Sequence, residues 1–196
     1  MHYACLVITK EFPTDDVLYR MVEPFNEEDF YEKFTDSDHI GESDYPPFLW
    51  DYWKVGGRYG GGIKLRIDKD DNTPYNWQFY APARAGRLYR SRFVENQYDM
   101  VHMMKGKYPV TFSEEDIYSY LGWDDGFLRV DGAKISDVLN LSDLDCHQFI
   151  DKDGKGYTRN WWNGKDFIPN PDFDKQLSAA LADSADCYIC YLDMHD

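Results

Sequence analysis

Long apolar runs, a basic surplus and repeated cysteine motifs are all missing from this sequence of 196 residues. No apolar run approaches the ~18 residues that a bilayer-spanning helix needs, so we expect no membrane partner. The first nine residues lack the basic start and long apolar segment of a signal peptide, and they have the pattern of a buried strand. The sequence therefore predicts a cytoplasmic protein.

Positive charge is scarce throughout the chain. The 21 Lys and Arg residues face 36 Asp and Glu residues, which leaves a formal net charge of −15. Such a field repels phosphate backbones and anionic lipids, which excludes general nucleic-acid binding through a broad basic surface. Aromatic residues make up 17% of the chain, too many for a protein that is mostly disordered.

Cysteine is also sparse, with four residues in the chain. Cys187 and Cys190 form a C-x-x-C motif, which is a common redox or zinc signal. The motif lies in a strand-like run, where positions i and i+3 face opposite ways, and no second C-x-x-C completes a tetrahedral site. We therefore favour reduced core cysteines over zinc, and we expect neither a metal nor a cofactor.

The order of expected elements predicts a single α+β domain over residues 1–196. Its sheet should be mixed or antiparallel, with helices packed mainly on one face. The first and last strands are apolar throughout, so we expect them to be adjacent near the sheet centre. The expected elements are strands at 1–9, 63–67 and 187–194, helices at 14–22, 83–97, 113–122 and 171–184, hairpins at 127–135 and 146–157, and loop-like segments at 24–47 and 68–82.

The strongest local feature is the stretch 50–62, where five glycines fall within seven residues. Glycine is favoured where the backbone takes positive φ or another group approaches it closely. Arg58 lies inside this turn and has a planar fork suited to phosphate or carboxylate. One reading is a ligand site. The other is a structural turn with Arg58 buried against Asp51. The ligand-binding candidates near this turn are Trp50, Asp51, Trp53, Gly56, Gly57 and Arg58.

Two further groups could take part in chemistry. Asp193 and His195 are two positions apart, so on a strand they share a face, and an aspartate can orient an imidazole for acid–base catalysis. We name Asp193 and His195 as catalytic candidates, but our main expectation is that the protein is not an enzyme. Arg84 and Arg87 belong to the only dense basic cluster. They either supplement the ligand site or pair with carboxylates across a domain or dimer interface. A dimer interface would make the protein a homo-oligomer.

The stretch 50–59 resembles the W-D-W-x-x-G-G-R-W signature of a group of small phage and prophage proteins. The matching residues are Trp50-Asp51-Tyr52-Trp53 and, after two further residues, Gly56-Gly57-Arg58-Tyr59. Two later motifs of that group also have counterparts. The Asp153-Gly154 turn with the Trp161–Gly164 segment resembles its P-D-G region, and the stretch 191–195 resembles its closing V-D-x-H. Tyr52 and Tyr59 stand where the group has tryptophan, and the proline before Asp-Gly is missing. The resemblance implies a phage origin, and small phage accessory proteins often act against host defence.

These observations lead to one functional expectation and two alternatives. The first is a counter-defence protein in the host cytoplasm that binds and sequesters a small anionic nucleotide-type immune signal. In it Trp50 and Trp53 stack on the base, while Arg58 and the Gly56 and Gly57 amides hold phosphate. The second is an acidic inhibitor that binds a basic host defence nuclease in the manner of an anti-CRISPR protein. The third is hydrolysis of the signal nucleotide through Asp193 and His195.

Overall fold

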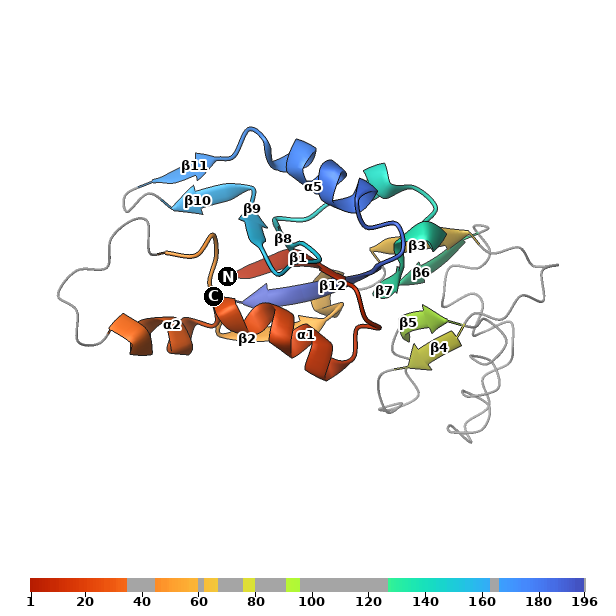
Figure 1. Ribbon diagram of the computed structural model, residues 1–196, viewed down its shortest axis with the longest axis horizontal. Helices are drawn as coiled ribbons and strands as arrows, with labels where there is room; N and C mark the ends of the chain where they lie inside the picture. Colours follow the sequence, from red (N-terminus) through yellow and green to blue (C-terminus); the bar gives the residue numbers. More distant parts are fainter. Residues whose placement is uncertain are drawn as a thin grey trace.

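The structure, a computed structural model, describes residues 1–34, 45–59, 62–66, 76–79, 91–95, 127–162 and 166–195 (Figure 1). Its helices are α1 (Asp15–Val22), α2 (Glu27–Phe34) and α5 (Phe173–Ala182). Its strands are β1 (His2–Thr9), β2 (Tyr52–Val55), β3 (Ile63–Arg66), β4 (Asn76–Phe79), β5 (Ser91–Glu95), β6 (Phe127–Val130), β7 (Gly132–Lys134), β8 (Gln148–Ile150), β9 (Gly156–Thr158), β10 (Asn160–Trp162), β11 (Phe167–Pro169) and β12 (Tyr188–His195).

A six-stranded mixed sheet forms the centre of the molecule, in the order β2-β12-β1-β8-β9 with β7 also paired to β12. β1 and β12 are antiparallel over their full length, from His2 opposite His195 to Thr9 opposite Tyr188. β1 and β8 are parallel, whereas β8 and β9 form an antiparallel hairpin. The expected α+β class and the central, adjacent position of the first and last strands are therefore confirmed.

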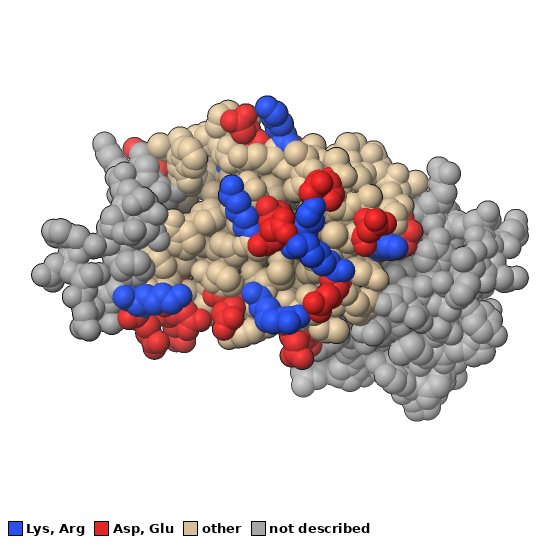
Figure 2. Space-filling model, in the orientation of Figure 1, with Lys and Arg blue, Asp and Glu red and all other residues tan. Residues whose placement is uncertain are grey.

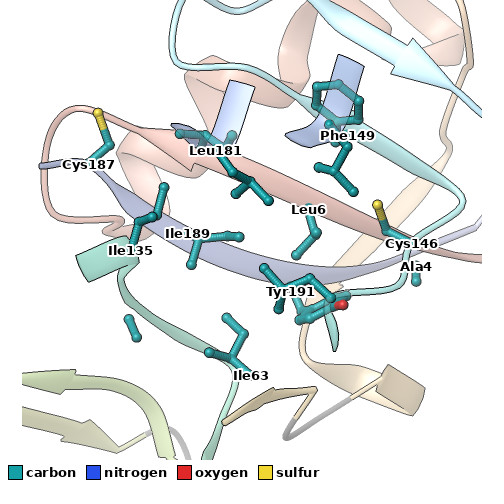
Figure 3. Packing of buried hydrophobic residues seen from close by; sticks show 14 of the residues in the cluster. Ala4, Leu6, Ile63, Ile135, Cys146, Phe149, Leu181, Cys187, Ile189 and Tyr191 are labelled. Atoms are coloured by element: carbon teal, nitrogen blue, oxygen red, sulfur yellow. The ribbon is translucent and has the colours of Figure 1, made fainter. Parts of the chain in front are cut away.

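Each face of the central sheet carries its own hydrophobic core, because alternate residues of β1 and β12 point to opposite sides. Leu6, Ile189 and Tyr191 pack on one face with α5, as Figure 3 shows. Val7 and Leu192 pack on the other face with residues of α1. Burial on both faces explains why these two strands are apolar almost from end to end.

Helices cover both faces of the sheet, with α1 and α2 on one side and α5 on the other (Figure 1). α1 begins where expected, since the Thr14 hydroxyl accepts a hydrogen bond from the Val17 amide at 3.3 Å. α5 lies within the expected 171–184 segment and buries Phe173, Leu177 and Leu181. Across the described ranges, no helix is both long and apolar enough to cross a membrane.

The four cysteines are buried free thiols. Cys187 and Cys190 lie in the cores on opposite faces of the sheet, as their spacing on a strand predicts. Their expected role as core residues is confirmed. Burial raises the pKa of the Cys146 thiol to about 12 and raises that of Cys5 as well.

The hairpin expected at 127–135 is wrong. β6 pairs with β3, whereas β7 pairs with β12, so the Asp131-Gly132 step joins two different sheets. Asp131 is 6% exposed, and its carboxylate lies against Gly56. The Asp-Gly signal identified the break between two strands, but long-range pairing decided their partners.

The hairpin expected at 146–157 is confirmed as β8–β9, and its loop has five residues, 151–155. The Asp151 carboxylate accepts hydrogen bonds from the amides of Asp153 and Lys155, and Gly154 has a φ of +84°. This internal bonding closes the loop as the turn of the hairpin.

Several elements were not predicted from the sequence, including β2 and the β10–β11 pair. α2 lies within the 24–47 segment, where Asn26 caps it by accepting a hydrogen bond from the Asp29 amide at 3.0 Å. β4 lies within 68–82, and β5 replaces the last part of the helix expected at 83–97; the two strands pair with each other. The helix expected at 113–122 lies outside the described residues.

Candidate functional site

Polar side chains replace the hydrophobic core at one end of the sheet face that α5 covers. His2 on β1, His195 on β12 and Tyr52 on β2 are directly opposite one another, so their side chains share a face. In the next row on that face, Asp193 lies opposite Lys54. We call this surface the histidine edge; it comprises His2, Asp51, Tyr52, Lys54, Arg58, Asp193 and His195.

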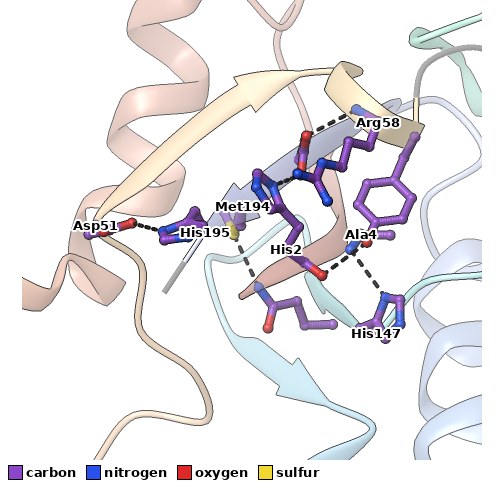
Figure 4. A network of polar contacts seen from close by, with 10 residues as sticks. His2, Ala4, Asp51, Arg58, His147, Met194 and His195 are labelled. Atoms are coloured by element: carbon purple, nitrogen blue, oxygen red, sulfur yellow. Dashed lines mark hydrogen bonds and ion pairs between the residues drawn. The ribbon is translucent and has the colours of Figure 1, made fainter.

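Two aspartate–histidine pairs lie side by side at the histidine edge (Figure 4). His2 Nδ1 is 2.8 Å from Asp193 Oδ1, and His195 Nδ1 is 2.9 Å from Asp51 Oδ1. The two imidazole rings meet edge to face with centroids 4.9 Å apart. A carboxylate only accepts hydrogen bonds, so each Nδ1 carries a hydrogen and each Nε2 is left for other partners.

Asp193 fixes the first pair in place. It is 5% exposed, and both of its oxygens are bonded, Oδ1 to the His2 ring and Oδ2 to the Arg58 amide at 2.9 Å. A buried carboxylate needs such partners to offset its lost hydration. The Tyr59 hydroxyl also donates to the His2 carbonyl at 3.0 Å. The 3₁₀ turn Gly57–Tyr59 is therefore attached directly to the first histidine.

The second pair is open to solvent. The side chains of His195 and Asp51 are 39% and 48% exposed. The hydrogen bond from His195 holds the pKa of the Asp51 carboxyl below its usual value. The Asp51 amide also donates to the His195 carbonyl at 3.0 Å, which extends the β2–β12 ladder and positions both residues.

Two exposed cations flank the histidines. Arg58 does not contact Asp51, since Asp51 pairs with His195 instead. Its guanidinium extends toward His2 in Figure 4, and within the described part of the chain no ion pair engages it. Lys54 is likewise exposed beside Asp193 on the sheet, and the described residues give it no ion pair. The expected burial of Arg58 against Asp51 is therefore wrong.

The expected stacking roles of the two tryptophans are also wrong. Trp50 is 5% exposed in the core beneath α1, and its Nε1 donates to the Val22 carbonyl at 2.7 Å. Trp53 lies opposite Met194 and packs against that same core, on the sheet face away from the histidines. The exposed ring at the site is Tyr52, which is 53% exposed.

The expected phosphate-binding role of the Gly56 amide is wrong as well. This amide donates to the Tyr191 carbonyl at 2.8 Å, and the residue has a φ of +68°. An added Cβ at Gly56 would lie 2.6 Å from the Asp131 carboxylate, so glycine is needed here for the local backbone conformation. Gly57 opens the 3₁₀ turn that positions Arg58.

Asp193 and His195 share a face as expected, but each bonds a different partner. Sequence reasoning missed His2 and Lys54, which join the site only through strand register.

His147 lies nearby, and its Nδ1 accepts a hydrogen bond from the Ala4 amide at 3.1 Å, so this third imidazole has a backbone partner. Arg84 and Arg87 lie outside the described residues.

Among the residues that the structure describes, no group of three or more His, Cys, Asp or Glu is placed to hold a metal ion. No family model matches the chain, and neither a curated protein nor a solved structure matches it. The histidine edge must therefore be interpreted from its own chemistry.

Proposed function

We propose that the histidine edge binds a small phosphate-bearing ligand of nucleotide type and sequesters it. The observation that supports this most is the position of Arg58 and Lys54, two exposed cations without ion pairs to described residues, beside two imidazoles. A guanidinium binds phosphate through two parallel N–H···O bonds, and an ammonium adds a point charge.

The charge of the whole chain makes this local arrangement selective. A net charge of −15 weakens the binding of long anionic polymers, whose many phosphates meet repulsion across a wide surface. A ligand with one or two phosphates contacts only the histidine edge. Tyr52 supplies an exposed ring next to His195 on which a base can stack. Together with the resemblance to small phage proteins, this makes a signal nucleotide of host defence our proposed ligand.

The alternative, an acidic inhibitor of a host nuclease, would depend on a surface of one sign. On the face drawn in Figure 2, basic and acidic side chains lie next to one another. Ion pairs such as Lys10–Asp153 and Arg20–Glu11 join opposite charges in the described region. We therefore place ligand binding ahead of the inhibitor.

The test is calorimetric titration of the protein with a panel of mononucleotides, cyclic nucleotides and cyclic dinucleotides, using the variants Arg58→Ala and Arg20→Ala. The first variant keeps the Arg58 amide that bonds Asp193, so the fold should be retained. The second removes an exposed arginine on α1, paired with Glu11 at 3.3 Å, and is the matched control.

We expect at least one nucleotide to bind the wild type, Arg58→Ala to weaken its binding by tenfold or more, and Arg20→Ala to leave it unchanged. Equal binding by wild type and Arg58→Ala would contradict the assignment of Arg58. Failure of every nucleotide to bind, together with a salt-sensitive complex with a host nuclease, would favour the inhibitor.

A further inference from the structure

We infer that the two aspartate–histidine pairs of the histidine edge cleave ribonucleotide phosphodiesters by general acid–base catalysis. The inference rests on the proposed function, because it needs the same site to hold the phosphate. It goes further by replacing sequestration with turnover for one substrate class: a phosphodiester next to a free ribose 2′-hydroxyl.

The first step of the argument is the orientation of the rings. Each Nδ1 is bonded to a carboxylate, at 2.8 Å for His2 and 2.9 Å for His195. Within the described residues neither Nε2 has a hydrogen-bonding partner. A neutral imidazole held in this way offers an Nε2 lone pair, and a protonated one offers an Nε2–H. One base and one acid on adjacent rings are what a displacement at phosphorus requires.

The second step assigns the roles. The partner of His2 is the buried Asp193, whereas the partner of His195 is the half-exposed Asp51. Asp193 also bonds the Arg58 amide, so the His2 ring is tied to the turn that carries Arg58. We assign the acid role to His2, because Arg58 beside it holds the phosphate and its leaving oxygen at that ring, and the base role to His195. Arg58 lies beside His2 and stabilises charge on the phosphate oxygens.

The chemistry balances without a further reactant. His195 Nε2 takes the proton of the 2′-hydroxyl, O2′ bonds to phosphorus, the bond from phosphorus to O5′ breaks, and His2 gives its Nε2 proton to O5′. The products are a 2′,3′-cyclic phosphate and a 5′-hydroxyl. In a second step the roles reverse: His2 takes a proton from water, the water oxygen bonds to phosphorus, and His195 returns its proton to O2′, which leaves a 3′-phosphate.

The substrate class follows from what the site supplies. The histidine edge has groups to move two protons and to neutralise a phosphate. It has no serine, threonine or cysteine among its members to act as a nucleophile. A neighbouring ribose hydroxyl supplies that nucleophile from the substrate, already held close to phosphorus.

The test uses the whole chain with a diribonucleotide and with the diribonucleotide whose attacking 2′-hydroxyl is replaced by hydrogen. Binding is measured by calorimetry, and products are identified by liquid chromatography and ³¹P NMR. The variants are His2→Asn and His195→Asn. The asparagine amide can still donate to the aspartate, so only Nε2 is lost. His147→Asn is the matched control, because its side-chain oxygen can still accept from the Ala4 amide.

We expect both compounds to bind and only the diribonucleotide to be cleaved, through a 2′,3′-cyclic phosphate. His2→Asn and His195→Asn should each lower the rate by about 100-fold or more, with His147→Asn unaffected. A substrate with a p-nitrophenolate leaving group needs no acid, so it should restore the rate of His2→Asn but not that of His195→Asn.

The contrary outcomes are distinct. Binding of both compounds without cleavage of either would overturn the catalytic inference and leave the proposed function standing. Binding of neither would overturn both. Cleavage that persists in His2→Asn and His195→Asn would assign the activity to a contaminating nuclease and would also overturn the inference.

Discussion

Replacing Asp193 by asparagine changes one atom of a buried carboxylate and tests how the histidine edge is held together. The new amide side chain would keep an oxygen as acceptor for the Arg58 amide and would present an N–H to the His2 ring. His2 Nδ1 would then have to accept, so its hydrogen would move to Nε2. The fold should persist, because every hydrogen bond has a replacement.

The size of the effect follows from the loss of charge. Asp193 is 5% exposed and takes part in two charge-assisted hydrogen bonds. Such bonds contribute about 1.5–3 kcal/mol each, against about 0.5–1.5 kcal/mol for neutral ones. We therefore expect Asp193→Asn to lose about 2–3 kcal/mol in free energy of unfolding. For a chain of this size the Tm should fall by roughly 5–10 °C.

Asp51→Asn is the matched control, because it makes the same change in the exposed pair. An exposed ion pair contributes about 0–1 kcal/mol, so the Tm should fall by less than about 3 °C. Thermal unfolding of both variants gives the comparison, and ¹⁵N NMR of the imidazoles reports which nitrogen of His2 carries the hydrogen. Equal losses in the two variants, or a hydrogen that stays on His2 Nδ1 in Asp193→Asn, would refute this reasoning.

Three further variants test the reassigned residues around the site. Trp50→Phe should lose about 1–3 kcal/mol of stability, since a buried main-chain carbonyl at the end of α1 loses its donor, while calorimetry should show unchanged nucleotide affinity. Gly56→Ala should lower the free energy of unfolding, measured with denaturant, by at least about 1 kcal/mol more than Gly154→Ala does. Both glycines have positive φ, but only the alanine at 56 would place its Cβ 2.6 Å from the Asp131 carboxylate. Cys146 should contribute a fall in stability of about 1.4 kcal/mol for each pH unit between 9 and 12, because over that range its thiol, with a pKa raised to about 12, keeps a proton that the unfolded chain releases. Cys146→Ala should make the slope shallower by that amount, with the remainder left to other buried groups such as Cys5, and identical slopes in the variant and the wild type would contradict the assignment.

The parts of the fold that the sequence predicted correctly depend on local pattern. The apolar runs at both ends of the chain indicated buried strands, and Thr14 before two acidic residues indicated the start of α1. Asn26 carried a comparable signal for α2, which was overlooked because the surrounding segment is acidic. The Asp131-Gly132 step marked the break between β6 and β7, yet no local pattern shows that β7 pairs with β12.

The candidate site was predicted only in part, for a related reason. Arg58 was found because a glycine-rich turn is visible in the sequence. His2 and Asp193 are 191 positions apart, and only the register of β1 against β12 places them in contact. Trp50 was misassigned because a ring that could stack on a base looks the same in the sequence as a ring that fills a core.

The position of β12 between its neighbours has a consequence for how the chain folds. On one edge it pairs with β1, and on the other with both β2 and β7. These three strands precede it in the sequence, so during synthesis they leave the ribosome before the strand that joins them. Until β12 arrives their edges are open to other chains, which favours slow folding and aggregation of incomplete chains. Expression conditions that slow aggregation, such as lower temperature or chaperone supply, should therefore raise the yield of folded protein.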